Sequence, residues 1–474
     1  MTDTTWCPDL ASAEGPKYLA LAHALRDAVR EGRLTEGQKL PPVRELAWRI
    51  GVTPGTVARA YTIGTDEGLL QAAVGRGTFV SARQPRLGPS QSLHVERPEP
   101  DASGRGPVDL RSPQLPDVGQ SAALADSMAR VAARMTAGEI GQDWLEYPSL
   151  RRDRPLREAL VDWLGPRDLG RFDADEIVPA HGGQSAMNIV LQCCLRGDRP
   201  VVFAEELAYP GFRHAARLSR AEVVPVALDA QGLRPDALDA ACRRHGGRIV
   251  FITPEAQNPT SVRMPLSRRD EIVAVARAHD LQIIEDDCYS VPGNADPALR
   301  ALAPERVWHV SSLSKSVSAG LRVGCIITPR GMGEAGRLTA QHGFFGMARP
   351  LTDIVTDLLV SGRAAELRDK VNAVYARRLA MAVSALGLYD LSWQPGLSFL
   401  WLRLPTGWRA STFAREAEGA GVLIRSADEY ALQDHHAPNA VRIAVAAGVP
   451  EDRFARALDR LARLLANPPG DLPV

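Results

Sequence analysis

Short apolar runs alternate with helix-patterned segments through most of the chain. The runs at 201–203, 248–252 and 281–284 each hold at most one polar residue. Continuous apolar strands between helices are typical of a mostly parallel sheet that is buried on both faces. The pattern therefore predicts an α/β body. The same pattern places further strands at 307–310 and 324–327, and helices at 212–219, 234–245 and 266–279.

A different pattern occupies the N-terminal part of the chain. Apolar positions three or four residues apart between Tyr18 and Val29 predict one helix. Two shorter helices follow, one after Pro42 and one capped by Thr53. Two short strand-like runs then flank the Gly-Arg-Gly of residues 75–77, which predicts a hairpin with an arginine at its tip. This order is the helix-turn-helix pattern followed by a wing.

The second short helix offers polar side chains to a partner. Thr53, Gly55 and Thr56 are small enough for the backbone to approach DNA, and Arg59 is long enough to contact a base or phosphate. Residues 40–83 carry five arginines against three acidic residues, a mild local excess of positive charge. The alternative is a small helical docking domain whose arginines are solvated.

Residues 83–107 separate this part from the α/β body. They are rich in Pro, Gly, Ser and charged residues and show no apolar period, as linkers do. The sequence therefore predicts an N-terminal module at 14–82, a linker at 83–107 and a body at 108–474.

Composition excludes several classes of protein. The 474 residues exceed one ordinary domain. The 56 basic and 56 acidic side chains give no net charge, which argues against a protein whose whole surface binds polyanions. The six cysteines show no metal-ligand spacing, so we expect reduced thiols, no bound metal and a cytoplasmic protein. No apolar run approaches about 18 residues, so no membrane span is expected.

The chemistry of the body centres on Ser312-Leu313-Ser314-Lys315, with Arg322 between glycines seven residues later. This arrangement suits pyridoxal 5'-phosphate (PLP). Lys315 would supply the imine to the cofactor aldehyde. Ser312, Ser314 and Arg322 would hold the phosphate, with a two-pronged contact from the arginine.

Polar residues at two other strand ends are further candidates. Asp286 ends the run that begins at Leu281, where a carboxylate keeps the pyridine nitrogen of PLP protonated, and Asp287 is the competing candidate. Tyr289 and Asn258 are each placed to donate to the phenolic oxygen of PLP, which lowers the pKa of the imine.

A glycine loop and a tyrosine complete the candidate site. Gly183 and Gln184 lie where a loop opens a helical stretch, and such a loop presents backbone N–H groups and a positive dipole end to phosphate. Tyr209, in Ala208-Tyr209-Pro210-Gly211, could stack over the cofactor ring.

The segment from Tyr18 to Val80 resembles the GntR-type winged-helix DNA-binding domain, through the words LRDAVREGRL, GQKLPPVRELAWRIGVTPGTVARAY and EGLLQAAVGRGTFV. Val43 departs from the family, which usually has a small polar residue there. Gly64 also departs, and a glycine inside a helix costs about 1 kcal/mol of helix stability. The resemblance implies that double-stranded operator DNA is contacted by Arg44, Thr53, Thr56, Arg59 and Arg76.

Residues from about 108 to 470 resemble the fold-type I, class I/II aminotransferases, through QSAMN, AYPGF, QNPT, EDDCY, SLSK and GLR in the family's order. The resemblance implies that Tyr147 reaches the phosphate site of a neighbouring subunit. It also implies that Arg442 grips the carboxylate of a substrate or effector. It assigns the remaining cofactor contacts to Gly183, Gln184, Tyr209, Asn258, Asp286, Tyr289, Lys315 and Arg322.

Three residues depart from the aminotransferase pattern. Ser261 replaces the glycine that usually follows Asn-Pro-Thr, and Arg152 stands where a glycine usually follows the subunit-bridging tyrosine. His181 precedes the glycine loop where a smaller residue is common, either as a packing variation or as a residue that narrows the pocket.

The two halves together resemble the MocR-type regulators. The resemblance implies an α/β chain in which a winged helix-turn-helix is joined by a linker to a PLP-dependent transferase fold-type I domain. That domain would have a large part with a mostly parallel seven-stranded sheet and a small α+β subdomain at about 355–474. The resemblance also implies a homodimer that senses a small amino compound, such as an amino acid, a related amine or a sulfonate. The alternative is an active aminotransferase with an accessory DNA-binding-like domain.

Overall fold

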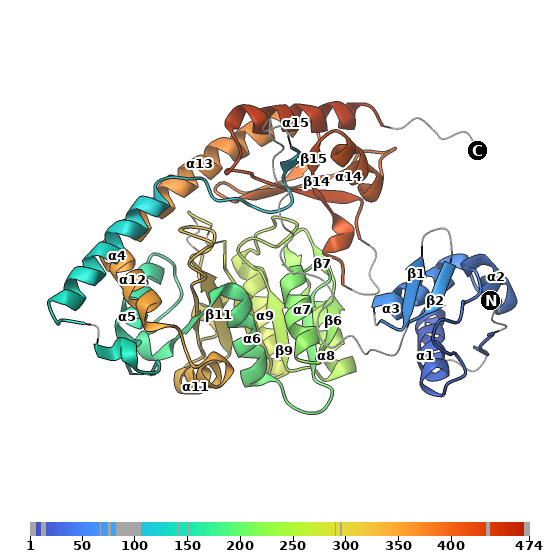
Figure 1. Cartoon of the computed structure of the whole chain (residues 1–474), viewed down its shortest axis with the longest axis horizontal. Helices are drawn as coiled ribbons and strands as arrows, with labels where there is room; N and C mark the ends of the chain where they lie inside the picture. The colour runs from blue at the N-terminus through green and yellow to red at the C-terminus, as the bar shows by residue number, and fades with distance from the viewer. Residues whose placement is uncertain are drawn as a thin grey trace. The chain divides into compact units, whose positions relative to one another are not determined.

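The computed structural model describes residues 6–10, 16–66, 68–73, 77–81, 106–140, 142–149, 151–289, 291–293, 296–432 and 437–468. The chain divides into two units, Met1–Val95 and Glu96–Val474 (Figure 1). Residues 82–105, which are most of the predicted linker, and Arg76 at the predicted wing tip lie outside the described residues.

The described part of the N-terminal unit contains three helices and a hairpin, as predicted. These are α1 (Lys17–Arg30), α2 (Val43–Arg49), α3 (Pro54–Asp66), β1 (Leu70–Ala73) and β2 (Gly77–Val80). The hairpin is antiparallel, with Leu70 opposite Val80. Leu25, Leu46 and Val57 bring one residue from each helix into a shared apolar core. The three helices therefore pack on one another with the polar side of α3 directed outward.

The large domain of the second unit is built on a sheet of seven strands. β12 runs antiparallel to both of its neighbours, and the other pairings are parallel, so the predicted mostly parallel sheet is confirmed. The order across the sheet is β4 (Ile177–Ala180), β12 (Gly324–Ile327), β11 (Val307–Ser312), β10 (Gln282–Asp286), β9 (Ile249–Ile252), β5 (Val201–Glu205) and β6 (Glu222–Val226).

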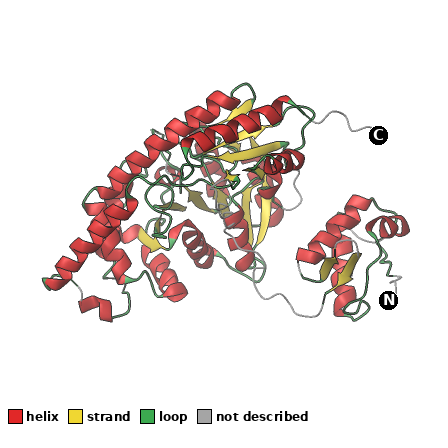
Figure 2. Ribbon diagram, turned by 45° about the horizontal axis from the view of Figure 1, so that its top comes forward, coloured by secondary structure: helices red, strands yellow, loops and turns green. Residues whose placement is uncertain are grey.

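Helices cover both faces of this sheet (Figure 2). On β9, Ile249 and Phe251 pack with α6 (Gly182–Cys194), α7 (Pro210–Leu218) and α11 (Gly333–Phe344). Val250 and Ile252 point the other way and pack with α8 (Pro235–His245) and α9 (Leu266–Ala278). Successive side chains of a strand face opposite sides, so a strand that is apolar at every position needs both layers.

A small subdomain is formed mainly by the C-terminal part of the chain. Its sheet has the order β13 (Asp390–Ser392), β14 (Phe399–Arg403), β17 (Ala440–Ala444) and β16 (Arg425–Ser426). Helices α13 (Arg363–Leu386), α14 (Ala410–Gly419) and α15 (Glu451–Ala466) pack on it. β3 (Val108–Asp109) pairs with β15 (Val422–Leu423), so the start of the body also belongs to this subdomain.

The long helix α13 links the two parts of the body. It lies against α12 (Arg349–Val360) at one end and α15 at the other (Figure 1). Among the described residues, no helix has both the length and the apolar content that a membrane crossing requires. The remaining elements are α4 (Gln120–Thr136), η1 (Gln142–Leu145), α5 (Arg154–Leu164), η2 (Ala174–Glu176), β7 (Leu228–Asp229), β8 (Gly232–Leu233), α10 (Leu299–Leu302) and η3 (Ala427–Glu429).

Candidate functional site

The sequence-predicted cofactor residues follow neighbouring strands of the seven-stranded sheet. Asp286 is the last residue of β10, and Lys315 follows β11 by three residues. Asn258 follows β9, and Tyr209 follows β5. These four strands are adjacent and parallel, so their carboxyl ends meet at one edge of the sheet. The fold therefore gathers at one edge residues that are more than 100 positions apart in the chain.

Asp286 and Asp287 point into different surroundings. The Asp286 carboxylate accepts a hydrogen bond of 3.0 Å from the Cys288 backbone N–H. Burial raises the pKa of Asp286, while the hydrogen bonds with Cys288 and the charge of His309 lower it. The Asp287 carboxylate is buried and lies 3.5 Å from the Arg167 guanidinium. Asp287 is therefore already paired with an arginine, which favours Asp286 as the carboxylate left for the cofactor.

Tyr209 and Tyr289 lie close to Asp286. Burial raises the pKa of Tyr209, and the nearby Tyr289 and Asp286 raise it further. Burial also raises the pKa of Tyr289, which the charge of Arg442 partly offsets. The two phenols and the carboxylate are therefore half-buried in one region, where a hydrogen bond to a ligand would be stronger than in open water because the local dielectric is lower.

The amino end of α6 forms a cradle beside Arg322. Gly182 has φ +77°, and a Cβ there would lie 2.9 Å from Nη2 of Arg322. That Nη2 donates to the carbonyl oxygen of His181 at 3.4 Å. A Cβ on Gly183 would lie 2.6 Å from Sγ of Cys288. The helix start has no side-chain cap, so its backbone N–H groups and the guanidinium point to an anion such as a phosphate.

The two predicted serines differ in their surroundings. The Ser312 hydroxyl donates to the carbonyl oxygen of Val323 at 3.3 Å and accepts from the Ser314 backbone N–H at 3.1 Å. It therefore braces the turn that leads to Lys315. The Ser314 hydroxyl is buried and has no hydrogen-bond partner among the described residues. A buried hydroxyl in this state costs about 1–3 kcal/mol, which a ligand oxygen would offset.

Asn258 and Gln184 also use their polar groups differently. Asn258 is buried and held through its backbone, whose N–H donates to Oγ1 of Thr253 at 3.4 Å. Its side-chain oxygen has no partner among the residues described. Gln184 donates through Nε2 to the carbonyl oxygen of Gly211 at 2.9 Å. Gln184 thereby braces the turn after Tyr209, while the side-chain oxygen of Asn258 is left for a ligand.

Arg442 is a buried cation surrounded by aromatic groups. It lies on β17 and is 5% exposed. Nη1 donates to the Tyr430 hydroxyl at 2.7 Å, Nη2 donates to the Tyr289 hydroxyl at 3.4 Å, and the guanidinium lies 4.3 Å from the centre of the Phe399 ring. Its Nε is buried without a partner within the described part of the chain. An anionic ligand would offset the cost of burying this charge.

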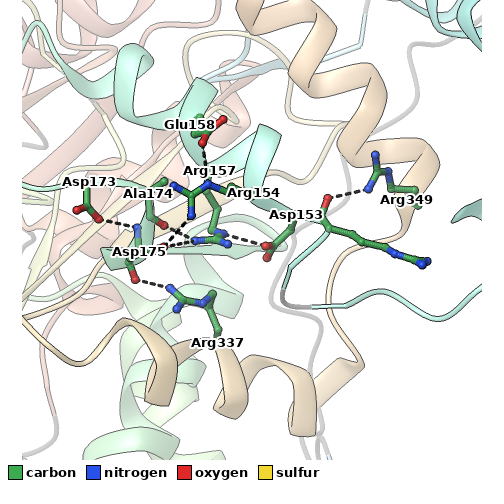
Figure 3. A network of polar contacts seen from close by, with 10 residues as sticks. Asp153, Arg154, Arg157, Glu158, Asp173, Ala174, Asp175, Arg337 and Arg349 are labelled. Carbon is green, nitrogen blue, oxygen red and sulfur yellow. Dashed lines mark hydrogen bonds and ion pairs between the residues drawn. The ribbon is translucent and has the colours of Figure 1, made fainter. Parts of the chain in front are cut away.

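Tyr147 lies on the surface, 80% exposed, with its ring stacked on Phe345 at 5.5 Å. The segment around it is attached to α12 on both sides. Before it, Nε1 of Trp144 donates to Asp353 at 2.9 Å. After it, Arg349 donates to the carbonyl oxygen of Arg152 at 2.7 Å (Figure 3). These anchors hold the segment against α12, while the Tyr147 ring lies on the surface of the body.

A buried arginine fixes the start of the next helix beside this segment. Arg157 donates to Asp153 at 2.8 Å, to the Ala174 carbonyl at 2.6 Å and to Asp175 at 3.3 Å (Figure 3). Burial raises the pKa of Asp153 more than the charge of Arg157 lowers it. The network ties α5 to η2 and so holds the Tyr147 segment at its C-terminal side.

In the described part of the N-terminal unit, the predicted DNA contacts are Arg44 on α2, Thr53 just before α3, and Thr56 and Arg59 on α3. The Thr56 backbone N–H donates to Oγ1 of Thr53 at 3.3 Å, and the two hydroxyls are 2.9 Å apart, so Thr53 caps α3 as expected. Arg44 and Arg59 are both exposed, and the Arg59 guanidinium lies 4.1 Å from the centre of the Tyr18 ring.

Sequence reasoning missed two buried residues that hold the loop carrying Asn258. Glu205 accepts from Oγ1 of Thr253 at 2.6 Å. Gln394 donates to the carbonyl oxygen of Ser261 at 2.6 Å. Glu205 lies two residues beyond the predicted strand at 201–203, and its place near a strand end was a signal that could have found it. Gln394 gave no signal, because its partners are backbone carbonyls more than 100 residues away.

Comparison with known proteins agrees with this geometry. The family described as "Aminotransferase class I and II" matches residues 108–461, and "Bacterial regulatory proteins, gntR family" matches residues 17–80. The "Uncharacterized HTH-type transcriptional regulator YdeF" of Bacillus subtilis is 28% identical over 466 residues, which cover 97% of each chain. The "Probable rhizopine catabolism regulatory protein MocR" of Rhizobium meliloti is 23% identical over 396 residues, covering 80% of this chain and 79% of that protein.

A solved structure matches the body. The α-aminoadipate aminotransferase LysN of Thermus thermophilus, crystallised with N-(5'-phosphopyridoxyl)-L-leucine, superposes with a TM-score of 0.64 and 25% identity. The match covers 76% of this chain and 92% of LysN. The family match spans most of the chain, and the fold agrees with it. The chain therefore belongs to the aminotransferase class I and II family, with a GntR-family helix-turn-helix domain ahead of that body, as in the MocR-type regulators.

Proposed function

We propose that this protein is a PLP-dependent, DNA-binding transcription regulator that senses a small amino compound. The observation that carries the proposal is the fusion itself. One chain holds a helix-turn-helix unit with exposed arginines and an aminotransferase body with a lysine at the gathered strand ends. Of the relatives named above, one is described as an HTH-type transcriptional regulator and the other as a probable regulatory protein, which supports a regulatory role.

The described residues fit PLP. When bound, PLP supplies an aldehyde carbon that exchanges amines and a ring that withdraws electrons. Lys315 would hold the cofactor covalently, and Asp286 would hold the proton on the ring nitrogen. Asn258 and Tyr289 would donate to the phenolic oxygen, and Tyr209 would stack on the ring. The phosphate would lie at the α6 cradle, held by the backbone of Gly183 and Gln184, by the Ser314 hydroxyl and by Arg322, while Ser312 would brace the turn that leads to Lys315.

The effector would be an amine that also carries an anionic group. Arg442 is buried and contacts phenol hydroxyls and aromatic rings, so a carboxylate or sulfonate would satisfy its unpaired Nε–H. The amine of the same molecule would displace Lys315 from the cofactor. Arg442 and Lys315 therefore define the two ends of the proposed effector.

We further propose that the regulator is a homodimer. Tyr147 is exposed on a segment anchored to α12, and a tyrosine in this state has its hydroxyl available to a neighbouring subunit's phosphate site. An effector that binds one closure state of the body better than another would shift that balance by about 1–3 kcal/mol. Through the linkers, this shift would change the placement of the two DNA-binding modules on the operator.

Operator binding tests the proposal. We expect the full-length protein with PLP to retain the DNA upstream of its own gene specifically, and an amino-acid or sulfonate effector to change the affinity or the footprint. A second candidate function, a true aminotransferase, is favoured by the presence of both Lys315 and Arg442. It is tested by supplying amino donors with a keto acid. Fast turnover without specific DNA retention would replace the regulator with the enzyme.

Lys315→Ala tests the cofactor link. We expect the wild-type protein to show the visible absorbance of lysine-bound PLP and to keep the cofactor through desalting. Lys315→Ala should lose both properties, because no other described residue at the strand ends supplies an amine. Lys370→Ala, at an exposed lysine of α13, is the matched control and should keep both. A visible band that survives in Lys315→Ala contradicts the assignment.

A further inference from the structure

The loop that carries Asn258 is closed by its own backbone. The Gln257 N–H donates to the Val262 carbonyl at 2.8 Å, and the Ser261 N–H donates to the Gln257 carbonyl at 2.8 Å. The Gln257 side chain in turn accepts from the Thr260 N–H at 2.9 Å. The loop therefore moves as one piece, and whatever holds its ends also sets the position of Asn258.

On the large-domain side, Glu205 holds this loop. The Glu205 side chain is fully buried at the end of β5. One oxygen, Oε2, accepts from Oγ1 of Thr253 at 2.6 Å and from Nε2 of Gln257 at 3.2 Å. The same Thr253 hydroxyl accepts from the Asn258 N–H at 3.4 Å. The start of the loop is thus fixed to the sheet.

On the small-subdomain side, a single amide holds both ends of the loop. Gln394 follows β13 and is 7% exposed. Its Nε2 donates to the Glu255 carbonyl at 3.0 Å and to the Ser261 carbonyl at 2.6 Å. Two carbonyl oxygens fix the orientation of the amide, since only its NH2 group can satisfy them. Gln394 therefore spans the loop from the subdomain that also contains Arg442.

The chain just after Gln394 leads to Arg442. Leu397 and Phe399 share a buried apolar cluster with Ala256 of the Asn258 loop. The Phe399 ring lies under the Arg442 guanidinium and contacts the Tyr289 ring at 5.0 Å. A shift of this segment would therefore also move Arg442 and Tyr289. Through the loop, it would move Asn258 as well.

We propose that Gln394 is a positioning residue that couples the small subdomain to Asn258. Closure of the subdomain on an effector would move Gln394, and Gln394 would move the loop that carries Asn258. The proposal rests on the proposed function, because it gives a route from effector to cofactor. Its structural core, the tie between Gln394 and the loop, holds with or without the cofactor.

Hydrogen exchange in full-length protein prepared without PLP tests the tie. Gln394→Leu keeps the approximate size and removes both donors. We expect the amides of residues 254–264 to exchange about tenfold faster in this variant, because two hydrogen bonds of the loop are lost. Gln114→Leu is the matched control, because Gln114 is also buried and donates to a backbone carbonyl, that of Asp109 at 3.1 Å, away from the loop. It should leave the exchange of residues 254–264 unchanged.

The absorbance of the PLP-loaded protein gives a second readout. A weaker Asn258 contact to the phenolic oxygen should raise the pH midpoint of the visible band by about 0.5–1 unit in Gln394→Leu. Gln114→Leu should keep the wild-type midpoint. A structural role for Gln394 alone would lower stability without moving this midpoint.

The outcomes separate the two proposals. Faster loop exchange with a shifted midpoint supports the coupling, and unchanged loop exchange overturns it whatever the cofactor does. Loop loosening without a midpoint shift also overturns it, because the loop would then not set the Asn258 contact. If the wild-type protein binds no PLP, both the proposed function and the coupling to a cofactor fail. Hydrogen exchange of residues 254–264 still tests whether Gln394 holds the loop. Should Gln394→Leu fail to fold, Gln394→Asn, one carbon too short to reach both carbonyls, replaces it in both measurements.

Discussion

Ser261 carries a backbone cost that a glycine would not. Its φ is +64°, in the left-handed region, and its hydroxyl is buried without a partner among the described residues. Left-handed backbone costs about 1–2 kcal/mol for a residue with a Cβ. A glycine would adopt this backbone without that cost, which is a physical reason for the glycine that the resemblance to the aminotransferases implies at this position.

We expect Ser261→Gly to raise the free energy of unfolding of the body by about 1 kcal/mol. The variant removes the backbone strain and the buried, unpaired hydroxyl. The free energy gained in this way exceeds the cost of about 0.5–1 kcal/mol that comes from the greater freedom of glycine in the unfolded chain. Urea unfolding of the full chain measures it. Ser361→Gly is the control, because Ser361 has φ −72° and gains nothing from glycine. An equal effect in both variants would refute the strain argument.

Glu205 makes the stability of the body depend on pH. Burial raises the pKa of Glu205 to about 7, although hydrogen bonds from Thr253 and Gln257 lower it. The folded protein then binds a proton that the unfolded chain releases near pH 4.5, so this contribution is complete below about pH 4.5 and is lost as pH rises to about 7. Glu205→Gln removes the titration and keeps an acceptor for both donors.

We therefore expect the stability of Glu205→Gln relative to wild type to rise between about pH 4.5 and 7, by up to about 3 kcal/mol, and to level off above pH 7. Unfolding in urea at several pH values measures the difference. A difference that does not change with pH would contradict the raised pKa.

At the scale of elements, Gly64 shows how packing reverses an expectation from sequence. Inside α3 a glycine looks like a weak point. A Cβ there would lie 2.7 Å from Cδ2 of Leu25 and 3.0 Å from Cδ1 of Leu70. The glycine therefore lets α1 and the wing approach α3 closely. The helix gains about 1 kcal/mol from alanine, but overpacking costs about 1–3 kcal/mol.

Gly64→Ala should thus destabilise the N-terminal unit by about 1 kcal/mol on balance. Faster hydrogen exchange in α1 and α3 of the full chain is the expected readout. Gly55→Ala provides the contrast in the same helix, since its Cβ would meet only Oγ1 of Thr53 at 3.8 Å. That variant should slow exchange. If both alanines slow exchange, close packing does not explain Gly64.

Local patterns were enough to predict most strands, helices and strand-end residues. Lys315, Asp286 and Asn258 stood out because short-range motifs carry them, and the fold gathers them through parallel pairing. The antiparallel direction of β12 and the pairing of Val108 with Val422 depend on contacts between distant segments, which no local pattern records. The role of Gln394 was not predicted for the same reason, because its amide binds backbone carbonyl oxygens, which every residue has.

At the scale of the whole molecule, zero net charge means that DNA binding must come from a local face. Arg44 is exposed on α2, and each phosphate contact contributes about 0.9 to the slope of log affinity against log salt. If two modules of a homodimer bind one operator, Arg44→Ala should lower that slope by about 1.8, against about 0.9 for a single module. Titrations of the operator at several salt concentrations measure it.

The size of this change in slope tests both the Arg44–phosphate contact and the binding of two modules to one operator. Each bound module loses one phosphate contact in Arg44→Ala, so the change is proportional to the number of bound modules. Arg33→Ala is the control, since Arg33 is exposed in the same unit but pairs with Glu31 at 2.7 Å outside the helix-turn-helix. It should leave the slope unchanged. A slope that is unaffected in Arg44→Ala removes this residue from the DNA interface. A fall near 0.9 keeps the contact but contradicts a dimer that places both modules on the operator, and with it the proposal that closure of the body acts through two linked modules.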